Sequence, residues 1–87
     1  MTVYLVTNDL IRAGKNYDKI QAFKTKYDHR RLSESSYLIK SDKKPVVLFG
    51  EIQLSLREDD TLYIFSINKP YAGMGEPETT KWIYRNL

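Results

Sequence analysis

The segment Thr61–Ile67 (TLYIFSI) is the feature that most constrains how this chain can fold. Five of its seven residues are β-branched or aromatic, which is typical of a β-strand. Leu62 and Ile64 point to one face, and the alternating Tyr63, Phe65 and Ile67 point to the other. A strand with two apolar faces needs cover on both sides of its sheet. The sequence therefore predicts a sheet with apolar groups packed against each face.

The other elements follow from hydrophobic periodicity and from turn residues. In chain order they are predicted as a strand over Thr2–Asn8, a helix over residues 16–27, two hairpin strands over Asp28–Ser33 and Ser35–Lys40, and a short helix over Glu78–Arg85. Asn16 is predicted to cap the first helix. Trp82 and Ile83 are expected to dock the last helix on the domain.

Residues 46–57 fit two patterns. Leu48, Ile52 and Leu56 recur at helical spacing, and Pro45 suits the first turn of a helix, where its missing N–H costs nothing. Ile52, Leu54 and Leu56 also alternate with polar residues, as in a strand. The length of the segment and the position of Pro45 favour a helix.

Together these elements predict one α+β domain over residues 1–87 with the order β-α-β-β-α-β and a short C-terminal helical tail. The right-handed crossover rule gives an antiparallel sheet of strand order 4-1-3-2, with two helices on one face. The second face is left for the tail or for another copy of the chain. A homodimer with two-fold symmetry is the expected solution.

Composition limits the classes of function. The chain has 87 residues, no cysteine and a net charge of +3, so a disulfide framework and a thiolate metal site are excluded. Residues 1–44 carry ten Lys/Arg against five Asp/Glu, whereas residues 45–87 carry four against six. A basic first half suits an anionic partner, although a solvated surface would look the same. The N-terminal apolar run is short and contains Asp9, so it predicts neither a signal peptide nor a membrane span, and a cytoplasmic location is expected.

Asp9 is the candidate catalytic residue and metal ligand. It lies where the first strand enters a loop, a usual position for functional groups. Mg²⁺ accepts few protein ligands and keeps several waters, so one carboxylate per chain is chemically sufficient. The alternative is that Asp9 accepts a backbone N–H bond and caps the loop. His29, the one histidine, would need a positioned partner to act as a general base, and the sequence shows none.

Six basic residues at loops or element ends are candidate contacts for RNA or DNA phosphates: Arg12, Lys15, Arg30, Arg31, Lys43 and Lys44. Tyr37 or Tyr71 could stack on a base, although tyrosines in a small domain more often belong to the core or to an interface.

Several stretches also resemble a known family: VYLVTNDL, GKNYDKI, SSYLIKSD, DDTLYIFSI and the closing KWIYRNL. They are similar to the small bacterial proteins of the SinR family, which are similar to the CRISPR-associated ferredoxin-like nucleases and to virulence-associated protein D. The resemblance implies a ferredoxin-like domain that dimerises through its sheet, with Asp9 as the Mg²⁺ ligand. Two positions depart from that nuclease family. Asn8 stands where tyrosine is usual, and Trp82–Leu87 is predicted helical where those proteins continue into a fifth strand.

Two functions are therefore expected in order of preference. The first is a nucleic-acid-handling homodimer, acting as a Mg²⁺-dependent RNA or DNA endonuclease. The second is a non-catalytic interaction dimer that keeps the fold without the chemistry. A small-molecule-binding domain is a third class, for which the sequence shows no pocket motif.

Overall fold

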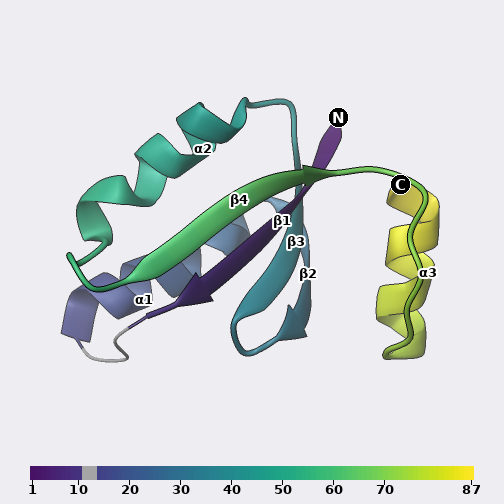
Figure 1. Ribbon diagram of the computed structural model, residues 1–87, viewed down its shortest axis with the longest axis horizontal. Helices are drawn as coiled ribbons and strands as arrows, with labels where there is room; N and C mark the ends of the chain where they lie inside the picture. Colours follow the sequence, from purple (N-terminus) through teal and green to yellow (C-terminus); the bar gives the residue numbers. More distant parts are fainter. Residues whose placement is uncertain (11–13) are drawn as a thin grey trace.

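The computed structural model describes residues 1–10 and 14–87, and the side chains of all of these except residues 14–17. It is an α+β structure with one four-stranded antiparallel sheet and three α-helices (Figure 1). The strands are β1 (Thr2–Asp9), β2 (Asp28–Ser33), β3 (Ser36–Ser41) and β4 (Thr61–Ile67). The helices are α1 (Gly14–Phe23), α2 (Pro45–Ile52) and α3 (Pro77–Asn86), and the short 3₁₀ turns Lys24–Lys26 and Gln53–Ser55 extend α1 and α2.

The sheet order is β2-β3-β1-β4, which is the predicted order 4-1-3-2 seen from its other edge. β1 lies between β3 and β4, with Leu5 opposite both Leu38 and Phe65. β2 pairs only with β3, and its register shifts between Arg31 and Ser33. Both β2 and β4 are therefore edge strands.

One face of the sheet carries the main core. Tyr4 and Val6 of β1 and Ile39 of β3 are buried there beneath α1 and α2. α1 contributes Ile20 and Phe23, and α2 contributes Leu48 and Ile52, at the helical spacing predicted from the sequence. The two helices thus cover the same face, as predicted.

The ambiguous segment after Pro45 is a helix. α2 begins at Pro45, with Lys44 in extended conformation as its N-cap, and the strand interpretation of residues 52–56 is excluded. One boundary prediction is wrong. α1 begins at Gly14, so Asn16 lies inside the helix and is not its N-cap. Asn is common both at caps and in first turns, so local composition does not define the first residue.

α3 packs against the second face, at the end of the sheet remote from α1 and α2 (Figure 1). Trp82 is buried against Val3 and Leu38, with Ile83 and Leu87 beside it. The tail is therefore helical, as predicted, and it covers part of the second face. None of the helices in the described residues is long and apolar enough to span a membrane.

Candidate functional site: the open sheet face beside Asp9

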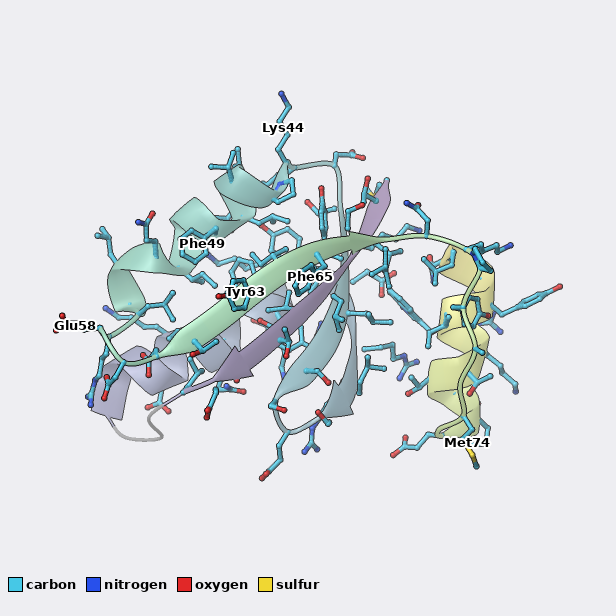
Figure 2. All side chains as sticks on the ribbon, in the orientation of Figure 1. Lys44, Phe49, Glu58, Tyr63, Phe65 and Met74 are labelled. Atoms are coloured by element: carbon cyan, nitrogen blue, oxygen red, sulfur yellow. The ribbon has the colours of Figure 1, made fainter. Side chains whose placement is uncertain are left out.

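The part of the second face that α3 leaves open is an aromatic patch on β4. Tyr63 is 61% exposed and Phe65 51% exposed, although both belong to the most hydrophobic strand of the chain. Their ring centroids lie 6.0 Å apart with an interplanar angle of 27°, so the rings stack on each other along the strand (Figure 2). We call this surface, made of Leu5, Thr7, Tyr63 and Phe65, the open face.

Asp9 stands at the end of this open face. Because side chains alternate along a strand, Asp9 shares its face with Leu5 and Thr7. In the β1–β4 ladder Asp9 lies opposite Thr61, and Thr7 lies opposite Tyr63. Asp9 is thus the diagonal neighbour of Tyr63, and its side chain is exposed. An exposed carboxylate at a strand end is suited to serve as one ligand of a hydrated Mg²⁺.

The described residues of one chain do not assemble a complete metal site. In the part of the chain that the structure describes, no three His, Asp or Glu side chains lie close enough together to hold a metal ion. His29 is also remote from Asp9. It lies on β2, which is separated from β1 by β3, and it pairs across the sheet with Ile39, which in turn pairs with Tyr4 of β1. Its Nδ1 lies 2.9 Å from the carbonyl oxygen of Tyr27, which holds the ring at the sheet edge.

The four predicted phosphate contacts whose side chains the structure describes, Arg30, Arg31, Lys43 and Lys44, are not gathered into one cluster. Arg12 and the side chain of Lys15 lie outside the described residues. Arg30 and Arg31 are neighbours on β2 and therefore point to opposite faces of the sheet. Lys44 is exposed and extends away from the body at the start of α2 (Figure 2).

Lys43 has a structural partner that the sequence did not reveal. Its Nζ lies 2.7 Å from Oε2 of Glu51 and donates to the hydroxyl of Tyr27 at 3.1 Å. The Tyr27 hydroxyl in turn donates to Glu51 at 2.7 Å. We call these three residues the latch, because they join the β3–α2 loop, the end of the α1 region and α2.

The latch shifts the pKa of each member. Burial and the Glu51 carboxylate raise the pKa of Tyr27. The hydrogen bond to Glu51 raises the pKa of Lys43. Burial alone would raise the pKa of Glu51, but the hydrogen bonds from Lys43 and Tyr27 outweigh it and lower that pKa. Within the latch, Lys43 and Glu51 form an ion pair that stays charged at neutral pH, which suits a structural role.

The two candidate stacking tyrosines differ sharply. Tyr37 is buried in the main core, and burial raises the pKa of its hydroxyl strongly. Tyr37 therefore cannot receive a base. Tyr71 is 46% exposed in the segment between β4 and α3. Sequence reasoning named these two tyrosines as candidate stacking residues and did not name Tyr63 and Phe65. Alternation with Leu62 and Ile64 shows on which face of the sheet Tyr63 and Phe65 lie, but it does not show whether that face is exposed.

Comparison of the chain with protein-family models, with curated proteins and with solved structures found no match.

Proposed function

We propose that this protein is a nucleic-acid-handling homodimer, built from a ferredoxin-like domain and joined through the open face. One observation carries the proposal: Tyr63 and Phe65 lie more than half exposed on the face that also carries Asp9. A folded chain of this size gains little from leaving stacked aromatic rings in water. Small domains bury a low fraction of their surface, so an additional interface stabilises them appreciably.

The charges around the open face favour a second copy there over a nucleic acid strand. Asp9 lies at its end, and the turn that leads into β4 adds the exposed Glu58 (Figure 2) and its exposed neighbour Asp59. Carboxylates repel phosphates, whereas a two-fold contact between aromatic patches is self-complementary and keeps the carboxylates at its rim. Tyr63 and Phe65 would form the buried centre of such an interface.

Such a dimer would carry one Asp9 carboxylate of each chain at its rim. Each would offer one oxygen ligand, and Mg²⁺ would complete its shell with water. The bound ion would supply a water of lowered pKa as the nucleophile for phosphodiester hydrolysis. Asp9 would hold the ion, and the exposed cations of the first half would position the phosphate backbone.

The cations remain accessible in such a dimer because they lie on other elements. Lys44 extends from the start of α2, on the far side of the sheet from the open face, and Arg31 lies on the edge strand β2. The excess of five positive charges over residues 1–44 supports binding of RNA or DNA by these side chains.

A non-catalytic interaction dimer is the second candidate. It is favoured by the absence, among the described residues, of any group of three or more His, Asp or Glu side chains that could hold a metal ion. The fold and the interface would then be kept, and the chain would hold a partner without cleaving it.

The assembly is tested by light scattering on the wild-type protein and on Phe65→Lys. We expect the wild type at micromolar concentration to have twice the 10.2 kDa mass of the chain. Phe65→Lys should be monomeric, because the interface would have to bury an unpaired charge. Val46→Lys is the matched control, since Val46 is an exposed apolar residue on α2, remote from the open face, and its variant should remain dimeric. A wild-type mass of one chain would refute the proposal.

A further inference from the structure

A groove runs between the second half of β2 and the beginning of α3. It consists of two adjoining hollows of about 340 and 390 Å³. Both are lined by Arg31 and Leu32 on the strand side and by Glu76 and Thr79 on the helix side. Volumes in this range are typical of binding sites for small ligands or peptide side chains.

The groove follows the open edge of β2. One hollow is lined by four consecutive residues, Arg30, Arg31, Leu32 and Ser33. A hollow on a sheet face would meet every second side chain, so consecutive lining residues indicate that it runs along the strand edge. β2 has β3 on one side only, so alternate N–H and C=O groups on its outer side have no strand partner.

The strand side of the groove is basic. Neither Arg30 nor Arg31 is paired with a carboxylate among the residues that the structure describes. Arg31 donates from Nε to the carbonyl oxygen of Ser33 at 3.2 Å, which leaves its terminal amino groups free for a ligand. Glu76 on the opposite wall offsets one of these two charges. The lining is therefore net positive by one charge.

The other hollow offers an apolar pocket. Leu32 is 44% exposed, and it faces Tyr71 and Ile83 across the hollow. Met74, fully exposed at the outer end of the loop before α3, extends the apolar rim (Figure 2). An occupant with one apolar side chain could bury it between the strand and the helix.

We propose that this groove binds an extended peptide segment of another protein, added as a fifth strand beside β2, in which acidic and apolar residues alternate. Strand addition satisfies the outer backbone groups of β2. The alternation sends acidic side chains to Arg31, and apolar ones, on the opposite face of the added strand, to the pocket of Leu32, Tyr71 and Ile83. The inference does not rest on the function proposed above.

A second copy of this chain does not fit the same edge. Two β2 strands pairing with each other in the antiparallel register centred between Arg30 and Arg31 would place Arg30 of one opposite Arg31 of the other. Like charges directly opposite each other destabilise a strand pair. Carboxylates on a bound peptide would attract the arginines of β2, where a second copy of the strand would repel them.

The test uses a fluorescein-labelled peptide of about ten residues in which Glu alternates with Val, long enough to pass along β2. Two matched peptides serve as controls, one with Lys in place of Glu and one with alternate backbone nitrogens methylated. We expect fluorescence anisotropy to show binding of the Glu peptide alone. Hydrogen exchange of the β2 amides should slow on binding, because the added strand protects them.

Protein variants complete the test. Arg31→Gln should weaken binding of the Glu peptide by about tenfold, the effect of losing one charge-assisted hydrogen bond. Arg85→Gln removes the same charge from an exposed position of α3 outside the groove lining and should leave binding unchanged. Equal binding of the methylated or the Lys peptide would overturn strand addition of an acidic segment. The proposal would also be overturned if the groove bound a single-stranded oligonucleotide and not the Glu peptide, and if Arg31→Gln weakened that oligonucleotide binding about tenfold.

Discussion

The indole Nε1 of Trp82 donates a hydrogen bond to Oδ1 of Asp28 at 3.0 Å, and this bond ties α3 to the first residue of the edge strand β2. The same indole ring is buried against Val3 and Leu38 on the second face of the sheet. Near the end of α3, Asn86 accepts a hydrogen bond from Nζ of Lys40 at 2.8 Å. These bonds fix where α3 lies on the sheet, and hence which part of the face it leaves open.

Trp82→Phe should lower the free energy of unfolding by about 1–2 kcal/mol, because the aromatic ring stays while the carboxylate of Asp28 loses its donor. Trp82→Ala should cost about 3–5 kcal/mol, since it also removes most of the cover from Val3 and Leu38. Urea denaturation followed by circular dichroism measures both. Tyr84→Phe, an exposed position on the same helix, is the control and should change nothing. A Trp82→Ala variant as stable as the wild type would show that α3 is not docked.

Glu51→Gln should destabilise the protein at neutral pH by no more than about 1 kcal/mol, since Lys43 is half exposed and solvent screens the pair. The folded state lowers the pKa of Glu51 below the ordinary glutamate value of 4.5. The stabilisation by Glu51 is therefore present above pH 4.5 and is lost as the pH falls through the lowered pKa. The difference in urea midpoint between the wild type and Glu51→Gln should accordingly shrink in acid.

The matched control for this pH dependence is Glu78→Gln. Glu78 pairs with Lys81 at 3.6 Å on the exposed side of α3, and both side chains are mostly in solvent. Its substitution should change stability little at any pH. A difference between the wild type and Glu51→Gln that persists unchanged at about pH 3 would contradict the assigned role of the ionised latch.

Nucleic acid binding should depend steeply on salt. If about four phosphates are neutralised per site, the logarithm of affinity should fall against the logarithm of salt concentration with a slope of roughly −3 to −4. Lys44→Gln should reduce the magnitude of this slope by about one, because it removes one exposed cation. Lys81→Gln, which removes a cation already paired with Glu78, should not. Anisotropy titrations of a labelled oligonucleotide measure the slopes, and binding that ignores salt would contradict phosphate contact.

Asp9→Asn should abolish Mg²⁺-dependent cleavage, because the amide keeps the size of the side chain and loses the charge that holds the ion. Binding of nucleic acid should be unchanged or slightly tighter, since a repelling carboxylate is gone. Asp59→Asn, an exposed carboxylate in the turn before β4, is the control and should cleave like the wild type. Undiminished cleavage by Asp9→Asn would assign the chemistry to another group. A wild-type dimer that binds without cleaving would support the non-catalytic alternative.

Most of the fold could be predicted from local sequence patterns. Alternation in Thr61–Ile67 and helical spacing in Leu48 and Ile52 are properties of neighbouring residues, so element types followed directly from the sequence. Pro45 decided the ambiguous segment, because it suits the first turn of a helix. Strand order followed from the handedness of the crossovers, which is a general property of L-amino-acid chains.

The candidate surfaces needed the tertiary structure, because they depend on contacts between residues distant in sequence. Alternation showed that Tyr63 belongs to an apolar strand face, but only the position of Trp82 decides that Leu38, on the same face of the sheet, is covered and Tyr63 is not. The sequence likewise predicted the same role, a phosphate contact, for Lys43 and Lys44. In the folded chain Glu51 lies beside Lys43, whereas Lys44 stays in solvent. The packing of α2 determines where Glu51 lies, and therefore which lysine it pairs with.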